Sequence, residues 1–222
     1  QPEFMETIWW VFKQLWNQGR VYRSHRIMPY SWRLSTPLSN FEAGSNYKDV
    51  QDPTVTVRTP IIESSNNRIN ELMKEGTTVY LLVWTTTPWT LPENLMMCAG
   101  ANIDYVVVRD LTDEARPCYV MAKLRLPSIF KKPEQYELVA EFKGSEMKGW
   151  RYEPIFPYYA DKAAEGAFRV LNDDYVTTDD GVGIVHIAPA YGEDDFRVCK
   201  EAGMNAIVDP LDSACAFTAE VP

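Results

Sequence analysis

The clearest helical pattern of apolar positions lies at the start of the chain. Residues 6–18 (ETIWWVFKQLWNQ) place their large apolar side chains on one stripe of a helix, and Gly19 follows as a typical helix stop. The stripe consists of Ile8, Trp9, Phe12, Leu15 and Trp16. This aromatic helix has two interpretations: it packs against a part of the protein outside this chain, or it packs on the chain's own core.

Short β-prone runs dominate the rest of the chain. Val79–Trp84 is an almost continuous apolar run, which is typical of a strand buried on both faces. One internal helix is predicted over 64–75, and residues 204–222 are expected to be largely irregular surface chain. Further strand candidates are residues 21–22, 55–58, 105–109, 118–122, 136–142, 168–171, 175–178 and 216–218. Many short strands with few helices predict an α+β, mainly β fold, in which a curved sheet or closed β-barrel carries peripheral helices.

The stretch from Gly181 to Phe196 (GVGIVHIAPAYGEDDF) combines a predicted strand, a loop and a helix start. Apolar residues recur at helical spacing after it, which predicts a helix from the three acids Glu193–Asp195 to about Ala202. The helix dipole favours a carboxylate in the first turn, so we expect it to stay ionised at neutral pH and to be able to meet a cation. Taken alone, these acids are also typical of simple helix caps.

Polar side chains near the ends of two predicted strands are candidates for chemistry. Thr85, Thr86 and Thr87 could deliver hydroxyl groups to a cleft, and Asn94 could add an amide. On their own, the threonines are more typical of β-branched residues that finish a strand. His186 lies among aliphatic residues, where a structural histidine is commoner than a catalytic one. No nucleophile elbow, GxGxxG or P-loop motif is present.

Composition excludes several classes of protein. The 222 residues are 45% hydrophobic and 13% aromatic, which is enough for a packed core. The net charge of -9 argues against broad binding of a phosphate backbone, so a nucleic acid would be held mainly elsewhere or touched only at one end. The four cysteines and two histidines show no zinc-ligand spacing, which predicts free thiols in a reducing compartment. No apolar run has the length of a membrane span, so a soluble intracellular domain is expected.

Two motifs together resemble a known family. TTTPWTLPEN (85–94) and GVGIVHIAPAYGEDDF (181–196) closely resemble the threonine-rich and GTGxVHxAPxxGxxD segments of the editing domain inserted into isoleucyl-tRNA synthetase, a class I aminoacyl-tRNA synthetase. Residues 21–52 also resemble the beginning of that domain in the eukaryotic cytoplasmic enzyme, so the resemblance covers essentially the whole chain. The valyl and leucyl relatives carry an arginine (TTRPET, TTRPDT) where this chain has Thr87, and they lack a histidine at the place of His186.

The resemblance implies a proofreading hydrolase with the fold of a class I editing domain. Neither HIGH nor KMSKS, the ATP-site signatures of this class, occurs, so the chain is not expected to activate amino acids. The implied organisation is a helical stub of the neighbouring catalytic domain over residues 1–20 and the editing domain over 21–222. The implied reaction is hydrolysis of misacylated Val-tRNA(Ile), with valyl-adenylate as a second candidate substrate. Synthesis alone excludes valine poorly, since one methylene is worth about 1–3 kcal/mol, as isoleucyl-tRNA synthetases themselves illustrate.

Roles for single residues follow from the same resemblance. Asp195 is expected to bind the α-ammonium group of the misattached valine, and His186 to line the side-chain pocket and reject isoleucine by bulk. Thr86, Thr87 and Asn94 are expected to hold the terminal adenosine, the ester and the attacking water, so that catalysis relies on positioning and hydrogen bonding. The implied catalytic residues are Thr86, Thr87 and Asp195, and the implied substrate-binding residues are Thr85, Trp89, Asn94, His186, Ala188 and Asp195. No cofactor, metal or covalent intermediate is implied.

The implied partners are the aminoacylated 3′ end of tRNA(Ile) and the rest of the synthetase chain, in a monomeric cytoplasmic protein with no membrane contact. Two alternatives stay open. A non-catalytic module that binds the aminoacyl-tRNA 3′ end is slightly favoured by Val182, which replaces the usual threonine of GTG and so lacks a hydroxyl group. A valyl-type editing domain that acts on Thr-tRNA(Val) is disfavoured by Thr87 and His186.

Overall fold

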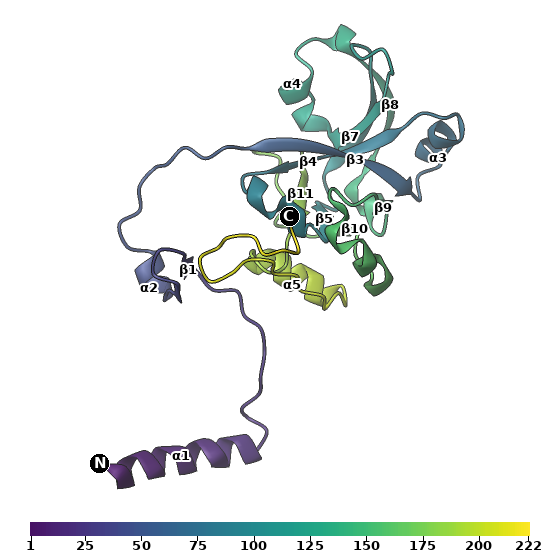
Figure 1. Ribbon diagram of the computed structural model, residues 1–222. Coiled ribbons are helices and arrows are strands. Elements are labelled where there is room, and N and C mark those ends of the chain that lie inside the picture. The colour runs from purple at the N-terminus through teal and green to yellow at the C-terminus, as the bar shows by residue number, and fades with distance from the viewer.

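The computed structural model describes residues 1–222, which form a β-rich body and an extended N-terminal arm (Figure 1). The body contains one nine-stranded sheet. Its strands are β3 (Val55–Glu63), β4 (Val79–Thr85), β5 (Met96–Ala99), β6 (Asp104–Asp110), β7 (Cys118–Ala122), β8 (Tyr136–Lys143), β9 (Arg151–Tyr152), β10 (Arg169–Asn172) and β11 (Ile184–Ile187). In the arm, β1 (Tyr30–Ser31) and β2 (Thr36–Pro37) form a separate hairpin.

The helices lie outside the sheet and are mostly short. The α-helices are α1 (Pro2–Asn17), α2 (Asn40–Ala43), α3 (Asn67–Lys74), α4 (Leu126–Ile129) and α5 (Glu193–Glu201). The 3-10 helices are η1 (Pro88–Glu93), η2 (Lys123–Arg125), η3 (Pro133–Gln135), η4 (Gly144–Met147) and η5 (Pro157–Glu165). No helix is long and apolar enough to cross a membrane.

Six strands close into a barrel. Their order is β11-β5-β10-β9-β3-β4, and β11 pairs again with β4 through Val185 and Trp84. The predicted buried run 79–84 is β4, which pairs with β3, β7 and β11. Its central position explains the continuous apolar run, because both of its faces are covered. The barrel with peripheral helices confirms the predicted fold class.

The remaining strands, β7, β6 and β8, extend the sheet beyond β4. They divide the apolar interior in two. The main core of 33 buried residues fills the barrel and its surroundings, with Trp150, Tyr105 and Tyr152 among its largest members. A second cluster of seven buried residues includes Phe130, which directly follows α4, and Val182. Both clusters border β4, so this strand is the part of the sheet that the rest of the body surrounds.

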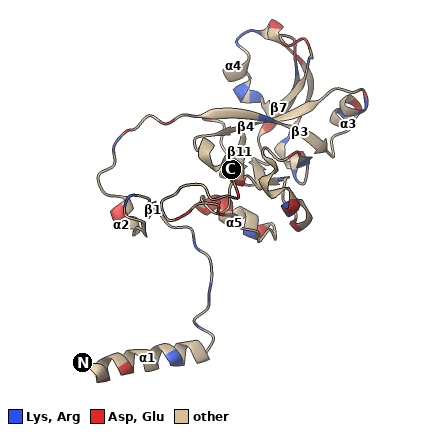
Figure 2. Ribbon diagram, in the orientation of Figure 1, with Lys and Arg blue, Asp and Glu red and all other residues tan.

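Local sequence signals place the two longer helices of the body. Asn66 caps α3 by accepting hydrogen bonds from the backbone N–H groups of Arg68 and Ile69, which confirms the predicted helix. α5 starts with three acids and spans the predicted range to within one residue. Figure 2 shows these acids gathered at the first turn of α5.

Several sequence expectations differ from the structure. Residues 21–22, a predicted strand, form none, and the first strand is β1. Residues 175–178 form no strand, because the chain turns there: the backbone N–H of Tyr175 donates to the Asp173 side chain. The final segment 204–222 is irregular as predicted, with a single β-bridge in place of the strand at 216–218. It is nevertheless not only surface chain, since Met204, Val208 and Val221 are buried in the main core.

The N-terminal helix α1 lies apart from the body (Figure 1). None of its residues is buried, and its stripe residues from Leu15 to Trp9 are 39% to 67% exposed. The interpretation that this helix packs on the chain's own core is therefore wrong. The stripe makes only internal aromatic contacts, Phe12 with Trp9 and with Trp16.

Candidate functional site

The two sequence motifs meet where the barrel closes. β4 ends at Thr85, and Pro88 then starts the 3-10 helix η1, which turns the chain back toward the barrel. β11 lies parallel to β4 and antiparallel to β5, with His186 opposite Met97. This pairing carries His186 to the side of the threonine-rich turn, although the two segments are about a hundred positions apart in the sequence.

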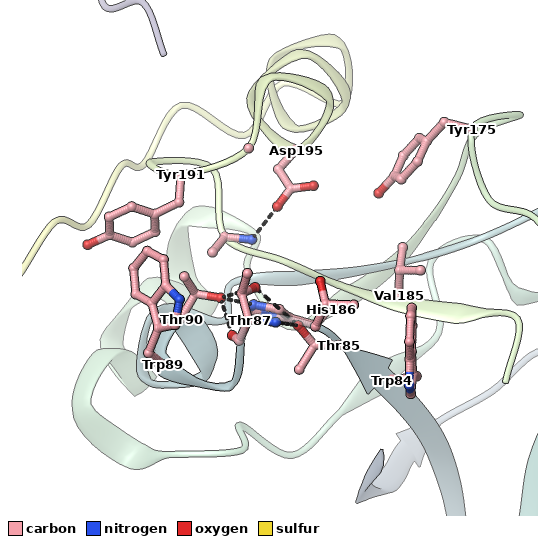
Figure 3. Close-up of a pocket in the computed structure, with 13 residues that line it drawn as sticks. Trp84, Thr85, Thr87, Trp89, Thr90, Tyr175, Val185, His186, Tyr191 and Asp195 are labelled. Carbon is pink, nitrogen blue, oxygen red and sulfur yellow. Dashed lines mark hydrogen bonds between the residues drawn. The ribbon is translucent and has the colours of Figure 1, made fainter. Parts of the chain in front are cut away.

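A cavity of about 290 Å³ lies between these segments and the start of α5 (Figure 3). Its lining combines hydroxyl groups, aromatic rings and one carboxylate, the mixture expected of a small polar ligand site. The lining residues are Trp84, Thr85, Thr86, Thr87, Trp89, Thr90, Tyr175, Val185, His186, Ala188, Tyr191, Gly192 and Asp195.

One side of the cavity, the threonine floor, consists of Thr85, Thr87, Thr90 and His186. Its hydroxyl groups bond to one another: Thr87 Oγ1 lies 3.2 Å from Thr85 Oγ1 and 3.0 Å from Thr90 Oγ1. The backbone also takes part, since the N–H of Thr87 donates to Thr85 Oγ1 and Thr90 Oγ1 donates to the carbonyl of Thr87. The floor is therefore a fixed hydrogen-bonded network. Among the consecutive threonines 85–87, only the exposed Thr86 has a hydroxyl group that makes no hydrogen bond within the protein.

Both ring nitrogens of His186 are occupied by protein groups. Asn94 Nδ2 donates to His186 Nδ1 at 3.0 Å and to the carbonyl of Met96 at 2.8 Å, while Tyr152 donates to Asn94 Oδ1. Because Nδ1 is an acceptor, the ring proton lies on Nε2, which faces Thr90 Oγ1 at 2.7 Å. Burial lowers the pKa of His186 to about 4, so the ring is neutral at physiological pH.

Asp195 lies on the opposite side, in the first turn of α5. It does not cap that helix; instead Asp195 Oδ2 accepts a hydrogen bond of 2.9 Å from the backbone N–H of Ala188. Burial raises the pKa of Asp195 to about 6, which the bond from Ala188 partly opposes. Burial thus outweighs the stabilisation that was expected from the helix start, and the carboxyl group remains mostly ionised at pH 7.

No basic side chain pairs with Asp195. The nearest arginine along the helix, Arg197, binds Asp173 and Asp194 instead. Gly192 leaves room for the carboxylate, since a Cβ at this position would lie 2.7 Å from Asp195 Cγ. The second carboxylate oxygen, Oδ1, has no hydrogen bond to the protein, so Asp195 can accept a cationic group from the cavity.

Aromatic side chains close the cavity on two further sides (Figure 3). Trp89 and Tyr191, here called the aromatic wall, contact each other edge to face with ring centroids 5.2 Å apart. Across the cavity lie Tyr175 and Trp84. The hydroxyl group of Tyr175 is buried and has no hydrogen-bond partner. Tyr175 thus adds a polar group to this side of the cavity.

The structure brings most of the predicted site residues together. Seven of the eight line the cavity: Thr85, Thr86, Thr87, Trp89, His186, Ala188 and Asp195. Asn94 does not; it is 4% exposed and lies behind His186, whose ring it orients. The sequence interpretation missed Thr90, Tyr175 and Tyr191. Only Thr90 carried a signal, because it follows Thr87 by three residues in a 3-10 turn, where side chains three apart are neighbours.

The replacement in the GTG motif lies outside the cavity lining. Val182 is 2% exposed and packs in the second apolar cluster. The structure also contains no group of three or more His, Cys, Asp or Glu side chains that could hold a metal ion.

Comparisons of sequence identify the family. The family described as tRNA synthetases class I (I, L, M and V) matches residues 1–190. The cytoplasmic isoleucine–tRNA ligase of Saccharomyces cerevisiae is 44% identical over 227 aligned residues, which cover 100% of this chain and 20% of the relative. The isoleucine–tRNA ligase of Bdellovibrio bacteriovorus is 44% identical over 99% of this chain and 19% of the relative, so similarity at this level is not confined to eukaryotes. The chain spans about a fifth of the length of these relatives.

Comparisons of structure identify the fold. The crystal structure of GlLeuRS-CP1 has a TM-score of 0.52 and 16% identity, with 71% of this chain and 66% of that chain covered. The P. falciparum cytosolic leucyl-tRNA synthetase editing domain has a TM-score of 0.53 and 10% identity, with 68% and 66% covered. The chain therefore belongs to the class I tRNA synthetase family, in which it corresponds to the editing-domain region of isoleucyl-tRNA synthetase.

Proposed function

We propose that this region hydrolyses the ester bond of Val-tRNA(Ile), and so proofreads the product of isoleucyl-tRNA synthetase. The observation that carries the proposal is the single cavity in which Asp195, free of any basic partner, faces the threonine floor. An amino acid attached to the 3′ end of tRNA presents an ammonium group next to an ester, and the cavity offers an acid on one side and hydroxyl groups on the other. Valyl-adenylate, which has the same ammonium group, is a second candidate substrate.

Asp195 binds the ammonium group in this proposal. Its unbonded oxygen faces the cavity, and a charge-assisted hydrogen bond in a desolvated site is stronger than one between neutral groups. An ammonium group at this position would lower the pKa of Asp195 from about 6, so binding and ionisation support each other.

His186 limits the size of the side chain that enters. Since Asn94 and Thr90 hold both of its ring nitrogens, the imidazole cannot turn aside for a longer side chain without breaking two hydrogen bonds. The same bonds and its pKa of about 4 exclude His186 as the base that activates water. Catalysis then rests on Thr86 and Thr87, which hold the ester and the attacking water in position, as expected where no strong base is present.

The rest of the synthetase completes the proposed assembly. We assign residues 1–20 to the neighbouring catalytic domain, because α1 buries nothing against residues 21–222, which we assign to the editing domain. A chain with a net charge of -9 would leave most of the tRNA contacts to other parts of a monomeric cytoplasmic enzyme and take only the aminoacylated 3′ end of tRNA(Ile).

A binding experiment followed by a hydrolysis assay tests this function. Non-hydrolysable valyl- and isoleucyl-adenosine mimics are titrated into the chain by calorimetry, and mischarged tRNA is then offered to the full-length enzyme. We expect the valyl mimic to bind more tightly and Val-tRNA(Ile) to be deacylated. Binding without hydrolysis would instead support a non-catalytic 3′-end module, and preference for a threonyl mimic would support an editing domain of the valyl type.

Asp195→Ala and Asp194→Ala form a matched pair for the same assay. Both carboxylates lie in the first turn of α5, but Asp194 is exposed and bound to Arg197. We expect only Asp195→Ala to lose deacylation, and we expect both variants to keep isoleucine activation. Normal deacylation by Asp195→Ala would refute the assignment.

A further inference from the structure

A buried carboxyl group lies directly behind the aromatic wall. Glu93, the last residue of η1, is 0% exposed, although glutamate is seldom buried without a partner. Its Oε1 lies 3.4 Å from the Tyr191 hydroxyl, and its Oε2 has no hydrogen-bond partner. No ion pair involves Glu93; the other titratable groups around it are Asp209 and Tyr159, and Tyr159 in turn donates to Glu220.

Counting protons indicates the state of this group. The Tyr191 hydroxyl has one proton, and Asp209 Oδ1, which belongs to an exposed and hydrated carboxylate, accepts it at 3.0 Å. The same proton cannot also satisfy Glu93, so an ionised Glu93 would be a buried charge without a cation. A neutral Glu93 removes the conflict, because its own proton is then donated to the Tyr191 oxygen. Burial, together with the nearby Asp209, raises the pKa of Glu93 in agreement with this arrangement.

The chain of hydrogen bonds ends on a residue of the proposed active site. Tyr191 lines the cavity, and its ring contacts Trp89 edge to face at 5.2 Å. Trp89 is 49% exposed, and the Tyr191 ring is the aromatic ring that it contacts. Anchoring the Tyr191 hydroxyl between Glu93 and Asp209 therefore fixes the orientation of both rings.

We propose that Glu93 is a positioning residue for the proposed reaction: as a neutral acid it donates to Tyr191 and, with Asp209, fixes the aromatic wall against which the substrate binds. This inference rests on the proposed function, since it assumes that the cavity takes an aminoacyl-adenosine group. Glu93 acts only through Tyr191, because it does not itself line the cavity.

The first test is calorimetric titration of the 222-residue chain with the non-hydrolysable valyl-adenosine mimic. Tyr191→Phe removes the anchored hydroxyl and keeps the ring, and Glu93→Leu removes the hydrogen bond and keeps most of the volume. We expect each variant to weaken binding of the mimic about fivefold, the loss typical of one hydrogen bond. The double variant should bind the mimic no less tightly than whichever single variant has the lower affinity. Glu93→Gln, which can still donate to Tyr191, should bind within about twofold of the unchanged chain.

A matched control separates positioning from loss of stability. Tyr159→Phe breaks the hydrogen bond to Glu220 in the same region but touches no residue of the cavity lining through its hydroxyl. It should lower the melting temperature without changing the affinity for the mimic. Equal affinity of Tyr191→Phe and the unchanged chain would overturn the inference, as would a Glu93→Gln variant that binds as weakly as Glu93→Leu, since the ionised form would then be required.

Infrared spectroscopy tests the protonation state directly. At a pH above the ordinary pKa of glutamate, the unchanged chain should show a C=O stretch of a protonated carboxylic acid that is missing in Glu93→Gln; absence of this band from the unchanged chain would overturn the neutral-acid assignment. Failure of the proposed function is recognised separately. If the unchanged chain does not bind the mimic at all, the function is wrong, whereas if it binds and the variants bind equally well, only the role of Glu93 is wrong.

Discussion

The two sides of the cavity differ in how completely the protein satisfies their polar groups. On the threonine floor, His186 has a partner at each nitrogen and its pKa is lowered to about 4. Opposite it, Asp195 has one hydrogen bond and no cation, and its pKa is raised to about 6. Polar groups that are satisfied internally fix a shape, while an acid left partly unsatisfied retains interaction free energy for a ligand. In the proposed function, the floor thus provides geometry and Asp195 provides recognition.

The largest expected effect comes from removing that recognition. In the full-length enzyme, Asp195→Asn should reduce deacylation of Val-tRNA(Ile) about 100-fold or more, because truncating one partner of a desolvated charge pair costs about 2–5 kcal/mol. The measurement is the initial rate of deacylation with saturating mischarged tRNA. Asp194→Asn, one position away and exposed, should stay within about twofold of the unchanged enzyme. Equal losses in the two variants would show that the comparison between floor and acid is mistaken.

Removing the imidazole should damage the floor rather than the recognition of ammonium. His186→Ala removes one buried hydrogen-bond partner from the Asn94 amide and one from the Thr90 hydroxyl, and it opens a void, so we expect the free energy of unfolding to fall by about 2–4 kcal/mol. Chemical denaturation measures this change. The other histidine, His25, is exposed and its ring makes no hydrogen bond, so His25→Ala is the matched control with no expected change.

The folded His186→Ala variant also tests the selectivity for valine over isoleucine. Its affinities for the valyl and isoleucyl mimics should approach each other, because the imidazole that excludes the extra methylene of isoleucine is gone. One methylene is worth only about 1–3 kcal/mol in this enzyme family. A preserved preference for the valyl mimic would move the size limit to another part of the lining.

On its acid side, the affinity for the valyl mimic should depend on pH through Asp195. The ligand ammonium needs the ionised carboxylate, so affinity should fall by about tenfold per pH unit below about pH 6. Titrations between pH 4.5 and pH 7.5 would measure this fall in affinity, and Asp195→Asn should show no such fall. His186 cannot account for such a fall, because its pKa of about 4 lies below this range. Affinity that is constant across the range would contradict the proposed ammonium site.

The smallest expected effect is a gain in stability. The folded-state pKa of Asp195, about 6, lies above its ordinary value of 3.8, so ionisation of Asp195 costs folding free energy as the pH rises through 6. At pH 8, Asp195→Asn should therefore be more stable than the unchanged chain by about 1–2 kcal/mol. Below about pH 4 the carboxyl group is protonated in both states, and the difference should vanish. A loss of stability at pH 8 would show that folding favours the carboxylate.

The sequence predicted the parts of the site that local pattern controls. The apolar run of β4 indicates burial on both faces, and the acids after Gly192 indicate the start of α5, so both sides of the cavity could be assigned from spacing and family resemblance. The number and length of the β-prone runs predicted a curved sheet or closed barrel, of which the structure has the closed barrel.

What the sequence could not supply depends on pairing between distant segments. Asn94 lies behind His186 only because β11 pairs with β5, and no local pattern specifies that neighbour. β11 also pairs with β4, and this second pairing brings the His186 imidazole next to Thr90. Tyr175 lies in a turn although the β-prone residues 175–178 predicted a strand, because the Asp173 side chain accepts a hydrogen bond from the backbone there. Burial of Glu93 is likewise a property of the assembled fold.

The closure of the barrel rests on one registered pair, Val185 with Trp84, and both residues also line the cavity. A bound molecule that touches both strands adds contacts across this junction, where a single ladder position otherwise joins the first and last strands of the ring. Occupancy should therefore slow amide hydrogen exchange along β11 and the end of β4 more than in the distant β6 and β8. A ligand that contacts both strands would therefore also stabilise the closure of the barrel.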